Sequence, residues 1–202
     1  EEKININVIK PENAVEDRVS TINPNIKYVN VDTTEQLRTE IERRKPLNEY
    51  INERGQKVVP GDFRGLLIKK ELVTIPNYQQ IESVVSEKVN GLADVRDPAD
   101  KEKIKECFLK KVLKQESEYR QFNSRDSQYY ELVASNTGSS PADGCCIGIS
   151  QVFVNAHPEF DPYNLITSYR ANVEAGFNIL MSSLRANNGD LAKAATGYRG
   201  KG

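Results

Sequence analysis

The sequence has few of the residues that bind metals or form cross-links. It contains one histidine, His157, and three cysteines, Cys107, Cys145 and Cys146. A single histidine argues against a metal site built from several histidines, and this cysteine spacing is not that of a zinc site. We therefore expect no metal and no cofactor. The odd number of cysteines permits one disulfide and leaves one free thiol.

A strong net charge and a long apolar segment are also absent. The chain has 28 Lys and Arg residues against 29 Asp and Glu, a formal net charge of −1 over 202 residues. Because a nucleic-acid-binding surface is usually basic, we expect no nucleic-acid partner. No apolar run reaches the roughly 20 residues that cross a bilayer, so we expect no transmembrane segment. No signal peptide is visible, and Glu1-Glu2-Lys3 has the character of a trimmed or mature start.

Residues 1–95 carry no motif that predicts chemistry. Their patterns predict short elements: a strand at 26–31, a helix at 32–44, a second helix at 46–55, an ambiguous segment at 63–75 and an amphipathic helix at 81–89. The polar stretch at 90–100 is the best candidate for a boundary. We therefore predict an accessory region at 1–95, of α+β or helical structure with an extended arm, packed on a second domain at 96–202.

One helix of the second part places a carboxylate on its apolar face. Asp97 and Pro98 predict its start. Apolar residues then recur at helical spacing: Ile104, Phe108, Leu109, Val112, Leu113 and Tyr119. Glu116 falls within their arc, and burial raises the pKa of a carboxyl group until it can act as a general acid. A structural glutamate paired with an arginine, or a helix that ends at Lys114, are the alternatives.

Four motifs, in order, resemble those of the lytic transglycosylases, which share the goose-type lysozyme fold. They are Glu116-Ser117, then Ser140-Pro141 with Gly148-Ile149-Ser150-Gln151, then Asp161-Pro162 with a single predicted helix from about 165 to 185 that carries Asn172 and Gly176, and finally Gly189-Asp190-Leu191 with Ala194-Ala195-Thr196-Gly197-Tyr198. The resemblance covers residues 96–202 and implies a mainly α-helical, lysozyme-like domain. Ser150 stands where the family has Met, and Arg199 where it has Asn.

The resemblance implies an enzyme that cleaves peptidoglycan with one carboxyl group. Glu116 would protonate the oxygen between N-acetylmuramic acid and N-acetylglucosamine. It would then accept the proton of the muramic acid C6 hydroxyl, which closes a 1,6-anhydro ring. Ser117, the segment from Gly148 to Gln151 and Tyr198 would bind the glycan or hold the acid, whereas Asn172 and Gly176 would be structural.

The same resemblance implies a setting outside the cytoplasm: periplasm, cell envelope or virion. The partner would be a peptidoglycan glycan strand. Residues 1–95 could join the domain to a larger envelope, secretion or phage assembly.

Other readings remain open on the sequence alone. Asp126 or Asp143 could position a water, which would make the protein a hydrolysing lysozyme or chitinase. A non-catalytic wall-binding or assembly component could keep the same fold, because fold and activity are separable. Glu116 argues against such a non-catalytic component, because a domain without activity has no reason to keep a carboxylate on an apolar face.

Cysteine chemistry offers a further alternative. Cys145 or Cys146 followed by His157 has the chain order of a cysteine peptidase, but no third orienting residue is evident. A disulfide from Cys107 to one of the pair is the preferred prediction. Cys107 lies on the helix of the acid, and the pair lies in the loop that the resemblance assigns to the groove.

Overall fold

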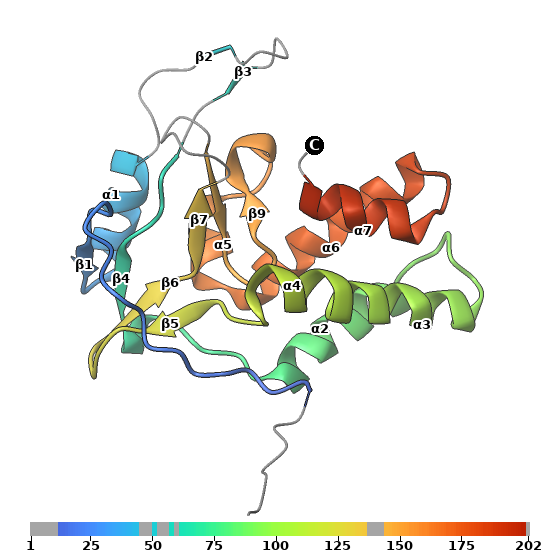
Figure 1. Cartoon of the computed structure of the whole chain (residues 1–202), viewed down its shortest axis with the longest axis horizontal. Helices are drawn as coiled ribbons and strands as arrows, with labels where there is room; N and C mark the ends of the chain where they lie inside the picture. The colour runs from blue at the N-terminus through green and yellow to red at the C-terminus, as the bar shows by residue number, and fades with distance from the viewer. Residues whose placement is uncertain (1–11, 45–49, 52–56, 59–60, 137–143, 201–202) are drawn as a thin grey trace, which may run out of the picture.

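The computed structural model describes residues 12–44, 50–51, 57–58, 61–136 and 144–200 (Figure 1). It is a mixed α+β structure in which helices make up about half of the chain. Most strands gather on one side and most helices on the other. The prediction of a mainly α protein is therefore right only in that helices predominate.

The largest sheet has four strands in the order β1-β4-β6-β5. In that order they are β1 (Val29–Val31), β4 (Leu66–Lys69), β6 (Tyr129–Leu132) and β5 (Phe122–Ser124). β1 and β4 are parallel, and the other neighbours are antiparallel. A second sheet is antiparallel throughout: β7 (Ala134–Asn136), β8 (Cys145–Ile147) and β9 (Val152–Phe153). Strands β2 (Tyr50–Ile51) and β3 (Lys57–Val58) form a separate pair.

The helices follow the apolar patterns of the sequence. They are α1 (Thr34–Arg44), α2 (Tyr78–Asn90), α3 (Pro98–Glu106), α4 (Lys114–Ser117), α5 (Pro162–Thr167), α6 (Tyr169–Ala186) and α7 (Leu191–Gly200). A π-helical segment, η2 (Cys107–Leu113), joins α3 to α4 without a break. Short 3₁₀ turns are η1 (Lys70–Leu72) and η4 (Val154–Ala156).

Helix α2 illustrates how local chemistry sets an element. Asn77 Oδ1 accepts the Gln80 amide at 2.9 Å, and Gln80 Oε1 accepts the Asn77 amide at 2.9 Å. This reciprocal cap satisfies two amides that the first helical turn leaves without partners. Ile81 and Val85 then face the core with 0% exposure, so the amphipathic helix predicted at 81–89 is confirmed.

Two hydrophobic clusters form the core, and each contains residues from both sides of the division predicted between residues 95 and 96. The helical cluster joins Val85 of α2 to Phe108 of η2 and Phe177 of α6. The sheet cluster joins Val31 of β1 to Ile147 of β8, with α1 and α5 packed on it. Because residues from both sides of the division share each cluster, the two parts are not separate packing units.

The start of the described chain is an extended arm at residues 12–28. It pairs with the edge strand β5 at one point, where Ser124 donates its amide to the Arg18 carbonyl at 2.7 Å and accepts the Ser20 amide at 2.8 Å. Arg18 also pairs with Glu118 at 2.6 Å. The arm thereby crosses from the sheet to the end of α4 (Figure 1).

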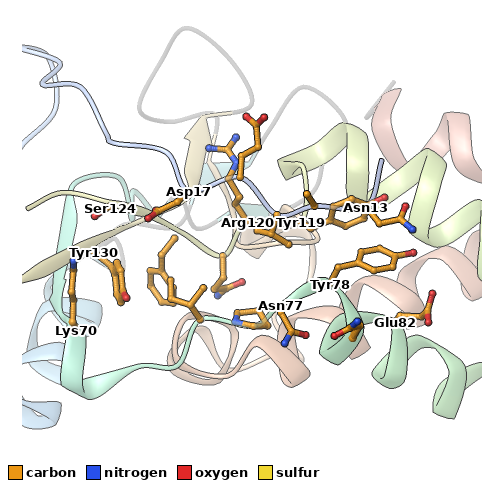
Figure 2. Close-up of a pocket in the computed structure, with 18 residues that line it drawn as sticks. Asn13, Asp17, Lys70, Asn77, Tyr78, Glu82, Tyr119, Arg120, Ser124 and Tyr130 are labelled. Carbon is orange, nitrogen blue, oxygen red and sulfur yellow. The ribbon is translucent and has the colours of Figure 1, made fainter. Parts of the chain in front are cut away.

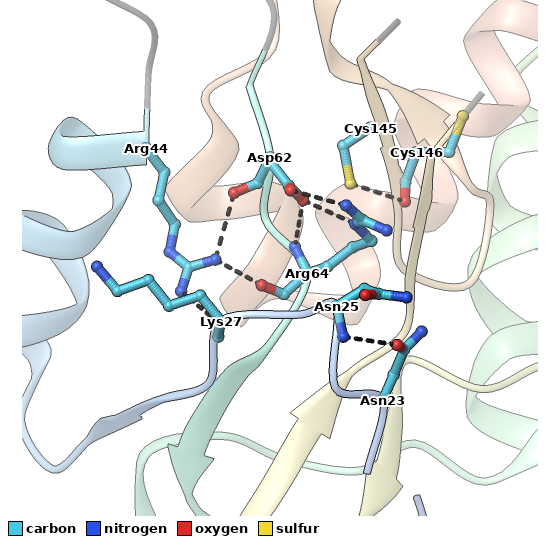
Figure 3. A network of polar contacts seen from close by, with 8 residues as sticks. All are labelled: Asn23, Asn25, Lys27, Arg44, Asp62, Arg64, Cys145 and Cys146. Atoms are coloured by element: carbon cyan, nitrogen blue, oxygen red, sulfur yellow. Dashed lines mark hydrogen bonds and ion pairs between the residues drawn. The ribbon is translucent and has the colours of Figure 1, made fainter. Parts of the chain in front are cut away.

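A polar network ties α1 to the segment before β4 (Figure 3). Arg44 donates to the backbone carbonyl of Arg64 at 2.5 Å and to that of Asp62 at 3.3 Å. The Arg64 guanidinium in turn pairs with the Asp62 carboxylate at 3.0 Å. Glu40, which is buried, pairs with Arg44 at 3.3 Å. These bonds satisfy a loop next to the buried Cys145, so we assign the network a structural role.

Two predicted helices need correction. Residues 50–51 of the helix predicted at 46–55 are strand β2. The rest of that predicted helix, 46–49 and 52–55, lies outside the described residues. The single helix expected from 165 to 185 is two helices. Ser168 between them is extended, with φ −114° and ψ 108°, and its Oγ accepts the Ala171 amide at 3.1 Å as the cap of α6.

The expected disulfide is also wrong. All three cysteines lie in the described part of the chain, all three are buried, and no disulfide joins them. Cys107 packs in the helical cluster and Cys145 in the sheet cluster. The thiols therefore contribute apolar packing and not a covalent link.

This gives a first prediction. Because no disulfide restrains the unfolded chain, the melting temperature should be the same with and without dithiothreitol, measured by circular dichroism. A thiol-reactive dye in denaturant should count three thiols per chain without prior reduction. A fall in melting temperature on reduction would contradict the free thiols.

Candidate functional site

Glu116 lies in the last turn of the long helix that starts at Pro98. The middle of this helix, η2, is π-helical, and its turns are wider than those of an α-helix. The wider turns change which residues face the core. Ser117 is 4% exposed, whereas Glu116 is half-buried at the edge of the buried face. The predicted partial burial of Glu116 is confirmed, and π segments of this kind are frequent at functional sites.

The chain reverses directly after the helix. Glu118 and Tyr119 both have positive φ angles, 52° and 65°, which are uncommon for residues other than glycine. Glu118 donates its amide to Lys114 O at 3.0 Å, and Arg120 donates its amide to Ser117 O at 3.1 Å. The helix therefore ends at Ser117, and the alternative in which it ended at Lys114 is wrong.

The backbone from Gly148 to Gln151, here called the 148–151 turn, is held by four side chains from three other parts of the chain. Ser117 Oγ donates to Ile149 O at 2.6 Å, and the Tyr198 hydroxyl donates to Ser150 O at 2.6 Å. Gln121 Oε1 accepts the Ile149 amide at 2.9 Å, and Asn172 Oδ1 accepts the Ser150 amide at 2.8 Å. All four of these side chains are buried, so the turn is positioned from inside the protein.

Local conformation explains the glycine and the glutamine at the two ends of this turn. Gly148 has φ +76°, and a Cβ there would lie 2.1 Å from Asn172 Nδ2, so no other residue fits. Gln151 also has a positive φ, 47°, and its Nε2 donates to Gly148 O at 2.9 Å. Gln151 Oε1 accepts from Ser135 Oγ of β7 at 2.6 Å. The turn is thus joined to the second sheet as well.

Tyr198 joins α7 to the 148–151 turn through its bond to Ser150 O. Its side chain is 5% exposed. Burial, and after it the nearby negative charge of Glu116, raises the pKa of the Tyr198 phenol. The charge of Glu116 acts on Tyr198, and Tyr198 and Ser117 both bond to the 148–151 turn. The predicted site residues therefore lie in one region. These residues are Glu116, Ser117, Gly148, Ile149, Ser150, Gln151 and Tyr198.

Asn172 and Gly176 of α6 have the structural role that the sequence predicted. Asn172 also donates Nδ2 to Ile147 O and Leu165 O, both at 3.1 Å. A Cβ on Gly176 would lie 2.4 Å from Ser150 Oγ and 2.8 Å from the Tyr198 hydroxyl. Gly176 is therefore the point at which α6 approaches the turn most closely.

Sequence reasoning missed Gln121 and Ser135. Gln121 also donates Nε2 to Leu165 O at 2.8 Å and Ile166 O at 3.0 Å, so one buried amide joins the turn to α5. Neither residue stands in a motif or at a spacing that marks it. Their contacts arise only when strands and helices distant in sequence are packed together.

Asp126, the residue proposed to position a water, does not join the site. Asp126 is exposed in the β5–β6 connection, where its Oδ1 accepts the amides of Gln128 at 2.7 Å and Tyr129 at 2.9 Å. These bonds lower the pKa of Asp126 and give it a turn-stabilising role. Asp143, Ser140 and Pro141 lie outside the described residues.

The cysteine-peptidase alternative has no support in the geometry. Burial raises the pKa of the Cys145 thiol to about 12, so it carries no thiolate at neutral pH. His157 Nδ1 lies 3.2 Å from Glu159 Oε1 at the surface. Within the described residues, no group of three or more His, Cys, Asp or Glu side chains could hold a metal ion. Likewise, no described helix is long and apolar enough to cross a membrane.

The arrangement can transfer a proton from one half-buried carboxyl group, beside a rigid turn with a neutral phenol behind it. Searches of family models, of curated proteins and of solved structures found no match to this chain. The chemistry of the site can therefore be inferred only from its own residues.

A second prediction tests the close approach of α6. Gly176→Ala should destabilise the protein by about 1–3 kcal/mol, because the added Cβ overlaps Ser150 and Tyr198. Gly197→Ala is the matched control in α7, since its Cβ would meet only Ser183 Oγ at 3.6 Å. The control should be neutral or stabilising by up to about 1 kcal/mol. Urea unfolding measures both, and equal effects would count against this packing.

A third prediction concerns pH. Buried tyrosines with raised pKa values favour the fold fully below their unfolded pKa of about 10, and this contribution is lost as pH rises above it. The pKa of Tyr78 and of Tyr119 is raised to about 12, and that of Tyr198 is raised as well. The free energy of unfolding should therefore fall above about pH 10. Tyr198→Phe should flatten this fall, whereas Tyr163→Phe, in α5, should leave it as in the wild type.

Proposed function

We propose that this protein is a lytic transglycosylase with a lysozyme-like helical fold, which cleaves the β-1,4 bond between N-acetylmuramic acid and N-acetylglucosamine in peptidoglycan. One observation carries the proposal. The half-buried Glu116 lies in the last turn of its helix beside Ser117, which bonds to the same 148–151 turn that Tyr198 bonds to. These are the residues that the family resemblance assigns to the acid and its surroundings.

The single carboxyl group serves twice in the proposed reaction. Glu116 first gives its proton to the glycosidic oxygen while the C1–O bond breaks and an oxocarbenium-like centre develops at C1 of the muramic acid. The Glu116 carboxylate then takes the proton of the C6 hydroxyl as that oxygen bonds to C1. The 1,6-anhydro ring closes, the proton count balances and no water is consumed.

The surroundings of Glu116 suit this double role. Partial burial favours the protonated form of a carboxyl group, which is the form that starts the reaction. Tyr198 is neutral near pH 7, as an ordinary phenol is, and its raised pKa extends that neutrality to higher pH, so it adds no second negative charge beside the acid. Ser117 and Tyr198 hold the turn through buried bonds of 2.6 Å, which keeps the wall of the site rigid while the proton moves.

The bonding of Asp126 gives the hydrolytic alternative no support. A hydrolysing glycosidase needs a second carboxylate within about 5–10 Å of the acid. Asp126 is committed to the β5–β6 turn through two backbone amides. We further propose an extracytoplasmic setting, where peptidoglycan is found, and contacts with a larger envelope, secretion or phage assembly through residues 1–95.

Glu116→Gln tests the proposal. The amide keeps the shape of the carboxyl group but has no proton to transfer. Cleavage of purified peptidoglycan should fall by about 10²–10⁴-fold, the loss typical of a missing general acid. Mass spectrometry of the wild-type digest should show 1,6-anhydro ends.

Glu118→Gln is the matched control, because Glu118 lies two residues on, carries the same group and is half exposed to solvent. It should keep wild-type activity. Reducing ends in the digest would point to a hydrolase instead. No product from the wild type, or full activity of Glu116→Gln, would reject the proposal.

A further inference from the structure

A cavity of about 800 Å³ lies between the N-terminal arm and the body of the protein (Figure 2). Its walls are the arm at 13–17, the start of α2 at 77–79 and the segment at 119–122. None of the seven candidate residues, all of which are described, lines it. Its volume lies in the range of sites for small organic ligands, which is about 300–1,000 Å³. The cavity is therefore large enough to be a second site.

One polar group of this cavity, the hydroxyl of Tyr119, is buried without a hydrogen-bond partner among the described residues. Tyr119 lines the cavity with a side chain that is 2% exposed. A buried hydroxyl without a partner costs about 1–3 kcal/mol. The positive φ of Tyr119 adds backbone strain at the same residue. A ligand oxygen that accepts from this hydroxyl would recover the lost bond.

Four aromatic rings contribute to the apolar part of the lining. Tyr78 and Tyr119 meet edge to face, with ring centroids 5.0 Å apart and planes at 76°. Tyr130 stacks on Phe122, with centroids 5.9 Å apart. In Figure 2, Tyr119 lies above Tyr78 and beside Asn13 of the arm. Flat rings of this kind pack against the C–H faces of a pyranose ring as well as against other apolar groups.

The charges of the lining argue against an anionic ligand. Lys70 Nζ lies over the Tyr130 ring, 4.9 Å from its centroid. The Arg120 guanidinium donates to Ser117 O at 3.1 Å and to Asn123 Oδ1 at 2.5 Å. Both cations are thus engaged with the protein itself. The cavity would give an anion little charge in return for its desolvation.

The other polar groups of the lining are amides and carboxylates. They include Asn13 and Asp17 of the arm, and Gln79 and Glu82 of α2. Amides both donate and accept hydrogen bonds, and carboxylates accept them. Such groups can bind the hydroxyls and acetamido groups of a sugar, while the tyrosine rings contact its apolar faces.

We propose that this cavity binds a short neutral oligosaccharide. The Tyr119 hydroxyl donates to a sugar oxygen, and a ring face of the sugar packs on Tyr78. This second site goes beyond the function proposed for Glu116 and does not require that Glu116 cleaves anything. Tyr119, which would bind this glycan, follows Ser117 by two residues. None of the candidate residues of the Glu116 site lines the cavity, so the two sites share no residue.

The test uses the Glu116→Gln chain, so that no probe is cleaved. Chitotetraose, the β-1,4-linked tetramer of N-acetylglucosamine, is titrated and followed by ¹H–¹⁵N NMR. The amide signals of Tyr78, Gln79 and Tyr119 should shift with a dissociation constant below about 1 mM. Tyr119→Phe in the same chain should weaken binding by about five-fold or more, the equivalent of one neutral hydrogen bond. Tyr163→Phe, the matched control, should bind as before.

The fold of Tyr119→Phe is expected to be as stable as the parent or more so, because the substitution removes a buried hydroxyl that lacks a partner. Gln79→Ala, at an exposed position of α2, gives a second variant that should also weaken binding. Shifts confined to the 148–151 turn would overturn the second site. So would an absence of binding up to about 10 mM, or binding of a neutral tetrapeptide in place of the glycan. Peptidoglycan cleavage by the wild type is measured separately, so failure of one proposal leaves the other standing.

Discussion

The structure depends on the hydrogen bonds that fix the backbone of the 148–151 turn. A buried backbone segment without regular structure must find partners for its amides and carbonyls, because each one left without a partner costs free energy. Gln121 and Asn172 accept two amides of the turn, and Ser117 and Tyr198 donate to two of its carbonyls. These four side chains come from three distant parts of the chain, namely residues 117–121, α6 and α7, so the turn orders the region around it.

The end of the long helix follows from the same constraint. Ser117 can reach Ile149 only if the helix continues through η2 and α4 and then stops. The π-helical turns direct Ser117 inward and leave Glu116 half-buried at the edge. The strained reversal at Glu118 and Tyr119 then directs the chain toward the second cavity. Glu116 and Ser117 thus belong to the first proposed site and Tyr119 to the second, and packing around this stretch stabilises an unusual backbone.

Local patterns predicted much of the helical structure but less of the rest. The cap at Asp97 and the apolar spacing of α2 depend on residues within a few turns of one helix, so a sequence displays them directly. The strands of the second half are two to four residues long, too short to show alternation. The break at Ser168 was missed because the apolar spacing runs on through it, while the backbone there is extended. The disulfide was wrong because chain position says little about which cysteines share a cluster.

Patterns along the chain were enough to select Glu116, Ser117 and Tyr198 as candidate residues and to locate the helices that carry them, because helix signals are local and motifs keep their order. The bonds of Gln121 and Ser135 to the 148–151 turn appear only in the folded protein, since they join segments far apart in sequence. The same is true of the turn that Asp126 stabilises and of the cavity that Tyr119 lines. Burial and hydrogen-bond partners depend on packing in three dimensions, and no pattern along the chain encodes them residue by residue.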